Sequence, residues 1–523
     1  MNASQRLVLN TAATYGRSVF ALALALFSSR WVLNSLGQSD YGLFSLVGSV
    51  IVFITFLNGV MAGSVSRYLA YAIGRGDPED VTHWFNTALS LHLCFAFSLV
   101  LIGWPIGDYV IAYVFHIPPE RIPACLWVFR ISLVSAFASM VSIPFVAMFT
   151  AHQNITEISA WGILQTVLSF TLAYTLTQIS GDRLLFYAIG MVAIIVLIQA
   201  VMIVRAFSIF RECRIVAKQW FDVRRLKDIF SFAIWNLIGN AGPTFRDQGS
   251  NILLNLFFGP GVNAAFGIAK QVSAQASMLS GAMTGALLPE LTASEGRGDR
   301  QRMLALSHRA GKFGAILVML FAIPLIAEMD YVLKLWLRTP PPYTGLFCQL
   351  ILSAYIMSRL GDGYMAAVNA AGKIAASQAT VGIILTLTLP LTWLFLKLGY
   401  PPTSAGVAFV ITSAICTTGL VYWFRRLFGE PASRWLETVL LPCLCVAVVA
   451  TVAALAPRWL MPPSVTRLVF VTALSIAATL LATWLIAFDA SEQTFLRQNS
   501  RRSLSKIGHA CQKRTAAWTG LTR

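Results

Sequence analysis

Long apolar runs alternate with short polar segments along almost the whole chain. A helix needs roughly 20 mostly apolar residues to cross a bilayer. About fourteen such runs occur, centred near residues 22, 54, 95, 137, 169, 195, 244, 277, 322, 358, 387, 413, 447 and 477. The pattern predicts an all-α, polytopic membrane protein with about 14 transmembrane helices.

One stretch of this pattern occurs twice. Residues 36–77 and 258–299 align without a gap at an offset of 222, with 12 identities over 42 positions. Both copies contain Gly-x-x-x-Gly within an apolar run, a spacing that lets another helix approach closely, and both end in Gly-Arg-Gly-Asp, which predicts a helix stop and a charged turn. The sequence therefore contains an internal duplication, which is common among transporters.

An even number of crossings separates the two copies, so both are expected to point the same way through the membrane. This predicts two parallel six-helix lobes around a pseudo-twofold axis, with a cleft between them and two extra C-terminal helices. The expected boundaries are an N-lobe at 1–208, a basic linker at 209–228, a C-lobe at 229–426, the added helices at 427–489 and a basic tail at 490–523.

Composition agrees with a membrane location, because 57% of the residues are hydrophobic and only 12% are charged. The net charge of +17 raises the question of a nucleic-acid partner. With both termini in the cytoplasm, roughly two thirds of the 39 lysines and arginines fall on the cytoplasmic side. The charge is therefore interpreted as topology and attraction to anionic membrane lipids, and no nucleic-acid binding is expected.

Six cations lie at membrane depth, where unpaired charge is costly and points to function: Arg17, Arg30, Arg130, Arg246, Lys270 and Arg359. The deep acids are Asp247 and Asp362. An excess of positive charge is tolerable if an anionic ligand occupies the cleft, and guanidinium groups suit phosphate oxygens.

The resulting candidate binding residues are Arg17, Lys270, Arg246, Arg359 and Arg30, with Arg17 and Lys270 foremost because neither has a local partner. Structural alternatives stay open. Arg30 can extend to the membrane surface, and Arg359 can neutralise Asp362 three residues away. Asp247 and Asp362 are candidates for ion coupling or for structural ion pairs.

Three predicted spans carry polar stripes. The residues Asn236, Asn240, Asp247, Asn251 and Asn255 fall on one face of the span near 244, and the spans near 277 and 358 repeat the pattern. Such faces avoid lipid, so they predict either hydrogen bonds between helices or a wet central cavity; Asn236 and Asn240 are taken as candidate sugar-binding residues. The cysteines and histidines show no metal-ligand spacing, and no catalytic constellation is present, so neither a cofactor nor an enzyme is expected.

Several motifs resemble a known family. They are Leu-Gly-Gln-Ser-Asp-Tyr-Gly-Leu-Phe at 36–44, Arg-Tyr-Leu-Ala at 67–70 leading to Gly-Arg-Gly-Asp at 74–77, Asp247, and Asn-Ala-Ala-Gly-Lys at 369–373. With the 6 + 6 + 2 layout, the chain resembles the bacterial polysaccharide-transporter or O-antigen flippase family of the multidrug/oligosaccharidyl-lipid/polysaccharide exporter (MOP) superfamily.

The resemblance implies a V-shaped, monomeric exporter in the bacterial inner membrane. It implies transport by alternating access of an undecaprenyl-diphosphate-linked oligosaccharide, an O-antigen or exopolysaccharide repeat unit, with a polysaccharide polymerase or co-polymerase as a candidate partner. The alternative is a cation-coupled drug or small-molecule antiporter of the same superfamily, which would require acids facing a positive substrate.

Overall fold

The computed structural model describes the backbone of residues 3–489 and 492–493. It describes their side chains except at 3–15, 18–19, 22, 54, 57–60, 231–233, 235–236, 277–289 and 292. These residues form helices and connecting turns, without a strand. Thirteen of the fourteen predicted apolar centres lie in a helix, and residue 387 lies in the turn between the helices at 374–386 and 388–397. Within the described residues ten helical stretches are long and apolar enough to cross a membrane. The helices at 223–258, 260–296 and 344–370 are not among the ten, and these are the spans with polar stripes.

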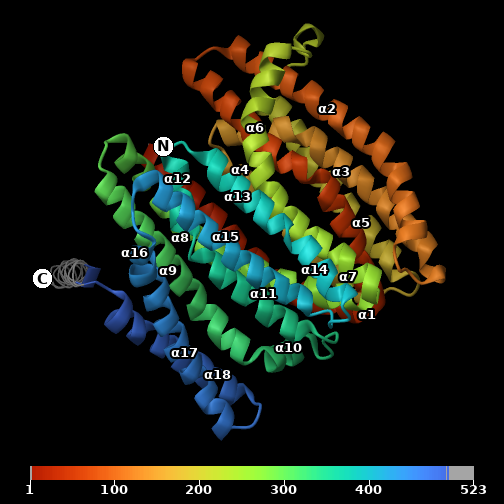
Figure 1. The fold of residues 1–523 in the computed structure, drawn as a ribbon. Helices are drawn as coiled ribbons and strands as arrows, with labels where there is room; N and C mark the ends of the chain where they lie inside the picture. The colour runs from red at the N-terminus through yellow and green to blue at the C-terminus, as the bar shows by residue number, and fades with distance from the viewer. Residues whose placement is uncertain (1–2, 490–491, 494–523) are drawn as a thin grey trace, which may run out of the picture.

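The N-terminal helices form one bundle, in which α3 packs against α1, α2 and α5, and α4 packs against α1 (Figure 1). Their bounds are α1 Ala3–Arg75, α2 Pro78–Tyr109 continued by the π-helical η1 Val110–Val114, η2 Pro119–Arg121, α3 Ile122–Ala151, α4 Ile155–Thr175 continued by η3 Leu176–Gln178, and α5 Arg183–Ile209. The α1 helix includes a kink at Gly37, so it contains two successive crossings.

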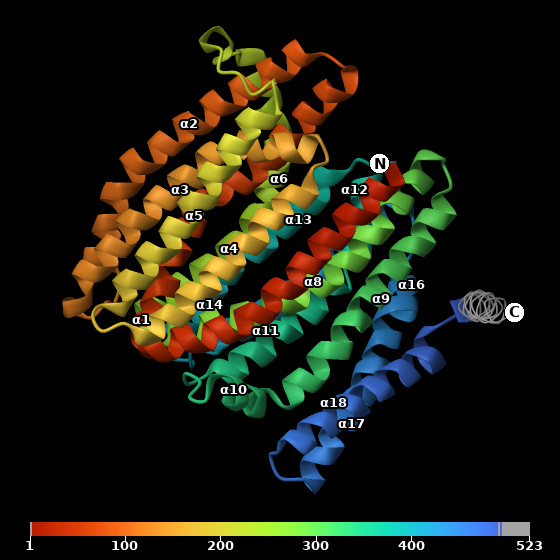
Figure 2. The ribbon, with the colours of Figure 1, turned by 180° about the vertical axis from the view of Figure 1, so that it is seen from behind.

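The second bundle lies beside the first, with its helices running in the same general direction (Figures 1 and 2). Its bounds are η4 Ala217–Gln219 in the linker, α6 Val223–Thr244, the π-helical η5 Phe245–Gly249, α7 Ser250–Phe258, α8 Pro260–Gly296, α9 Arg300–Ala327, α10 Met329–Leu337, α11 Thr344–Arg359, α12 Asp362–Ala370, α13 Ile374–Thr386, α14 Thr388–Lys397 and α15 Ser404–Phe428. The last pair comprises α16 Ala432–Trp435, η6 Leu436–Leu440, α17 Leu441–Leu460, α18 Val465–Ala482 and η7 Thr483–Ala487.

The duplication is visible in the backbone. Gly37 has φ 77° and ψ 173°, and its counterpart Gly259 has φ 77° and ψ −172°, a conformation that only glycine adopts easily. The repeated Gly-Arg-Gly-Asp forms the same turn twice, because Gly76 and Gly298 have φ of 74° and 75°. The following aspartates, Asp77 and Asp299, cap α2 and α9 through backbone N–H groups.

Both copies run from this kink to the end of the bundle where the N-terminus lies (Figures 1 and 2). They are therefore parallel, as the sequence predicted. The opposite end, which holds Gly37 and Gly259, is called the far end below.

The two copies meet each other at a seam between α1 and α8. A Cβ at Gly42 would lie 1.8 Å from Pro260 O and 3.3 Å from Ala264 N, and a Cβ at Gly267 would lie 2.9 Å from Ser45 Oγ. Because Gly42 and Ala264 are duplicates, as are Ser45 and Gly267, the pseudo-twofold axis runs through this seam.

The glycine pairs highlighted by the sequence do not make this seam. Gly63 has no neighbouring atom near the position of a Cβ, while Gly59, Gly281 and Gly285 lie outside the residues whose side-chain surroundings are described. The close approach expected at Gly63 is therefore wrong: in the described structure this glycine faces open space, and close packing occurs at Gly42.

The linker between the lobes is held on α2. The buried Asn86 accepts a hydrogen bond from Val216 N at 2.8 Å and donates one to Arg214 O at 2.7 Å. Asp222 caps α6; burial works to raise the pKa of this carboxyl, but hydrogen bonds from the backbone N–H groups of Arg225 and Arg224 and from the Arg225 guanidinium outweigh it and lower the pKa. The linker is thus an ordered connection that is hydrogen-bonded to α2 of the first lobe and caps the first helix of the second.

The two appended helices, α17 and α18, pack on α9 (Figure 1), and buried ion pairs join this region to α9 near its middle and just after its last residue. At the far end Glu328 binds Arg467 at 2.7 Å, and their side chains are only 1% and 9% exposed. Near the middle of α9, Lys312 binds Glu492 at 2.9 Å, with 5% and 6% of the two side chains exposed. Buried charges are stable only when paired, so these contacts lock the appended pair to the C-terminal lobe.

We expect Gly42→Ala to destabilise the seam, because the added methyl overlaps the Pro260 carbonyl. Overpacking of this kind costs about 1–3 kcal/mol. Thermal unfolding of the purified protein in detergent measures the effect. The matched control is Gly48→Ala on the same helix, where a Cβ meets no atom within 4 Å. A melting temperature for Gly42→Ala as high as that of Gly48→Ala would contradict the assignment of this contact.

Candidate functional site

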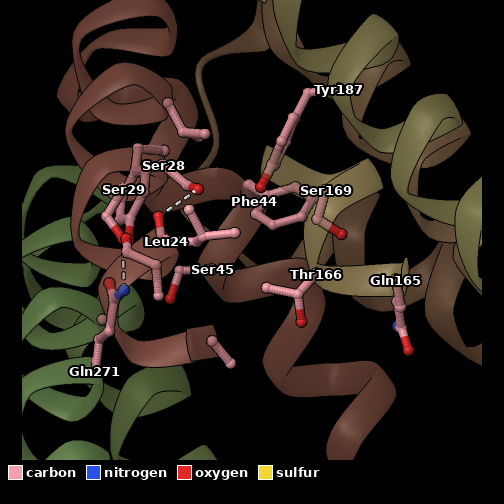
Figure 3. A pocket seen from close by; sticks show the side chains of 15 residues that line it. Leu24, Ser28, Ser29, Phe44, Ser45, Gln165, Thr166, Ser169, Tyr187 and Gln271 are labelled. Carbon is pink, nitrogen blue, oxygen red and sulfur yellow. Dashed lines mark hydrogen bonds between the residues drawn. The ribbon is translucent and has the colours of Figure 1, made fainter. Parts of the chain in front are cut away.

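A cavity of about 620 Å³ lies beside the seam. It is bounded by both halves of α1, by α4 and Tyr187 of α5, and by Gly267 and Gln271 of α8. Its polar lining is uncharged: Ser28, Ser29, Tyr41, Ser45, Gln165, Thr166, Ser169, Tyr187 and Gln271. Figure 3 shows Ser29 and Gln271 on one side of the space, and Tyr187, Ser169 and Thr166 on the other.

Several of these groups are available to a ligand. Among the described residues, no hydrogen-bond partner is found for the hydroxyls of Tyr41, Ser169 and Tyr187 or for the amide of Gln165. Hydroxyls and amides both donate and accept hydrogen bonds, and an unmatched polar group away from bulk water is costly. The cavity is therefore suited to a neutral ligand with many hydroxyl groups.

Arg17 lies one helical turn beyond the cavity. It precedes Ala21 of the lining by four residues on α1, and its side chain packs against Gly162, which precedes Thr166 by four residues on α4. A Cβ on Gly162 would lie 2.6 Å from Arg17 Nη1, so this glycine makes room for the guanidinium. Within the described part of the chain, Arg17 forms neither an ion pair nor a hydrogen bond.

A second charged group lies in the C-terminal lobe. Asp247 binds Arg246 at 3.1 Å and Lys270 at 2.5 Å, and both cations lie over the Phe409 ring. The π-helical turn Phe245–Gly249 breaks the regular helix here and places Asp247 beside α8. Lys270 has no local partner in the sequence, but Asp247, 23 residues away on a neighbouring helical segment, pairs with it in the fold. The cluster still has two cations for one acid.

The remaining deep charges are distributed differently. Arg359 binds Asp362 at 2.5 Å, as their spacing allowed, and stacks over Tyr355. Arg130 binds Asp108 at 2.6 Å. Arg30, like Arg17, has no ion-pair or hydrogen-bond partner among the described residues, and it is partly exposed.

The polar stripe of the seventh span is not a continuous wet face. Asn251 is 2% exposed and donates to Ser49 Oγ, while Asn255 is fully buried and bonds to Asn263 and to the His116 backbone. These residues form hydrogen bonds between helices, the structural alternative considered above. Asn240 is exposed, and the side chain of Asn236 lies outside the described residues.

Sequence reasoning missed the cavity because charge was the signal it followed. Its lining consists of isolated serines, threonines, tyrosines and glutamines, and these residues are common on ordinary packed helices. The one available signal was a difference between the duplicated copies. At the offset of 222, Ser28 corresponds to an identical Ser250. Leu24 and Ala25, which line the cavity, correspond instead to Arg246 and Asp247 of the ion cluster.

No protein-family model matches the sequence, and no curated protein does either. Solved structures do match. An inward-facing multidrug resistance MATE family transporter of the MOP superfamily gives a TM-score of 0.66 at 17% identity, covering 84% of this chain and 100% of that one. The lipid II flippase MurJ, in an inward closed conformation, gives 0.64 at 13% identity, covering 91% and 98%. A MOP superfamily transporter from Pyrococcus furiosus gives 0.59 at 16% identity, covering 84% and 100%.

These identities are too low to carry a substrate or a site from one protein to another. The long coverage of both chains nevertheless establishes the architecture. The chain is a multi-pass membrane protein with the fold of the MOP-superfamily transporters.

Proposed function

We propose that this protein is a bacterial inner-membrane flippase that moves an undecaprenyl-diphosphate-linked oligosaccharide by alternating access. Under this proposal both termini are cytoplasmic, and the far end faces the outside. The observation that carries the proposal is the uncharged, hydroxyl-rich cavity with Arg17, which has no ion-pair partner among the described side chains, one turn beyond it.

The cavity supports the sugar part of this cargo. Each sugar hydroxyl both donates and accepts, which matches the unpaired hydroxyl and amide groups of the lining. The volume of about 620 Å³ accommodates a few sugar residues and not a long polymer. A single repeat unit fits this limit, which supports transport before polymerisation.

Arg17 supports the diphosphate part. A guanidinium presents donors in a planar fork that matches phosphate oxygens, and here no described carboxylate competes for it. The polyprenyl chain would stay in lipid, since both lobes have apolar outer faces. Arg246 and Lys270 supply further positive charge on the other lobe, with Arg30 and Arg359 as remaining candidates.

The alternative, a cation-coupled drug antiporter, requires an acid that is free to receive a cation. Asp247 is held by two cations and Asp362 by one, so a positively charged drug would have to displace them. The charge balance around the lobes therefore favours an anionic cargo.

We expect Arg17→Glu to reduce export of surface polysaccharide by about tenfold to a hundredfold, because each hydrogen bond to a charged group is worth about 1.5–3 kcal/mol. Arg17→Lys keeps the charge and should retain part of the activity. The amount of polysaccharide at the cell surface is measured at equal membrane levels of each variant. Arg75→Glu, on an exposed arginine at the end of α1, is the control.

Normal export by Arg17→Glu would count against a diphosphate at this position. If Asp247→Asn failed in the same assay while Arg17→Glu worked, the cation-coupled antiporter would become the better explanation.

Removal of two cavity hydroxyls, in the double variant Ser169→Ala and Tyr187→Phe, should lower export about two- to tenfold per lost hydrogen bond. Stability should not change, because neither hydroxyl has a described protein partner. Export and thermal unfolding are measured together. Thr171→Val on α4 is the control, since that exposed hydroxyl bonds only to its own helix. Equal export by the double variant and by Thr171→Val would show that these cavity hydroxyls do not take part in transport.

A further inference from the structure

Several hydrogen bonds between described residues join the lobes, among them the contacts of Asn255 with the His116 backbone and of Asn251 with Ser45. Two others are related to each other by the duplication. Gln271 Nε2 donates to Ser29 Oγ at 2.5 Å, and Asn251 Nδ2 donates to Ser49 Oγ at 2.6 Å. The offset of the duplication relates both pairs, because Ser29 corresponds to Asn251 and Ser49 corresponds to Gln271. The two bonds are therefore pseudo-twofold copies, in each of which a C-lobe amide binds an N-lobe serine.

These bonds hold the far end of the lobes together. They lie on either side of the axis that passes between Ser45 and Gly267. Ser29 precedes the kink at Gly37 by eight residues, which places it roughly 12 Å along the helix from the far end. If the lobes part at that end, both bonds must break.

The two copies differ in their surroundings. Asn251 and Ser49 are 2% and 5% exposed, and Asn251 is also held by Asn263 at 2.6 Å. Ser29 and Gln271 instead line the cavity, and Figure 3 shows their bond at its edge. A ligand in the cavity can reach the Ser29–Gln271 bond directly, whereas neither Ser49 nor Asn251 lines the cavity.

We propose that Ser29 and Gln271 form a ligand-sensitive latch, in which hydroxyl groups of the bound cargo replace the Ser29–Gln271 bond and release the far end. This inference rests on the proposed function for the chemistry of its ligand, a polyhydroxylated one. A ligand shifts a conformational equilibrium only through differential contacts. In the closed state Ser29 and Gln271 satisfy each other, whereas with the lobes parted both are available to the ligand.

Water also competes for this bond, so the cargo must compete better. It does so because the other cavity groups hold its hydroxyls beside Ser29, which raises their effective concentration there. The sealed bond between Asn251 and Ser49 has no such competitor. It contributes to closure of the far end independently of the ligand, together with the other inter-lobe bonds.

The test measures opening of the seam directly. The reporter is Ala264→Cys, a fully buried position at the seam, labelled in intact cells with a membrane-impermeant maleimide. Ser45→Cys on the opposite helix is a second reporter if the first does not fold. Labelling is compared with that of the chain without the reporter cysteine. It is measured in cells that make lipid-linked sugar precursors and in cells in which the first sugar-phosphate transfer to the carrier lipid is blocked.

Without precursors, Ser29→Ala and Ser49→Ala should each raise labelling about two- to tenfold, as expected for one lost hydrogen bond. With precursors, labelling should rise in the parent and in Ser49→Ala but not further in Ser29→Ala. A rise in Ser29→Ala equal to that in Ser49→Ala would overturn the latch and leave the proposed cargo intact.

Two other outcomes are equally informative. Unchanged labelling in both alanine variants without precursors would show that these bonds do not hold the seam, which also overturns the latch. Labelling could also rise in both alanine variants while precursors leave the labelling of the parent unchanged. The two bonds would then still be seam contacts. Both the proposed cargo and the release of the Ser29–Gln271 bond by that cargo would be rejected.

Discussion

The close contact between α1 and α8 determines how the rest of the molecule is arranged. Two helices approach until the backbone at Gly42 touches the Pro260 carbonyl, because no side chain separates them. Packing attraction between such surfaces depends steeply on distance, because a gap of about 0.5–1 Å already forfeits roughly a quarter to a half of it. The seam therefore fixes how closely the two lobes approach each other in this structure.

The low dielectric constant of the membrane imposes the second constraint. Where a charge has only a structural role, it is buried against an opposite charge, as Lys312 is with Glu492 and Arg467 is with Glu328. These pairs secure helices that have no counterpart in the duplication. Arg17 differs because it is partly exposed beside a cavity and lacks a described partner. This contrast with the paired, buried charges is the reason why Arg17 is a candidate ligand-binding residue.

Much of the fold was predictable because membrane helices carry a strong apolar signal, and because Gly37 and Gly259 repeat a conformation that glycine alone adopts readily. Positions within the helices were harder to predict. The pairing of Lys270 with Asp247 depends on a π-helical turn and on how α6 and α8 pack, neither of which appears in residue spacing. The seam glycine, Gly42, lacks a glycine counterpart in the second copy, so the repeated Gly-x-x-x-Gly pattern drew attention to the wrong place.

The two lobes also show why duplication alone does not define a site. At equivalent depths one lobe has a neutral cavity beside Leu24 and Ala25, and the other has the Arg246–Asp247–Lys270 cluster. A compact cation would need only one acidic half-site and would gain nothing from the neutral one. A cargo with a neutral, hydroxyl-rich part and an anionic part needs two dissimilar half-sites. The two copies have therefore diverged in chemistry at equivalent positions while keeping the same backbone conformation at Gly37 and Gly259.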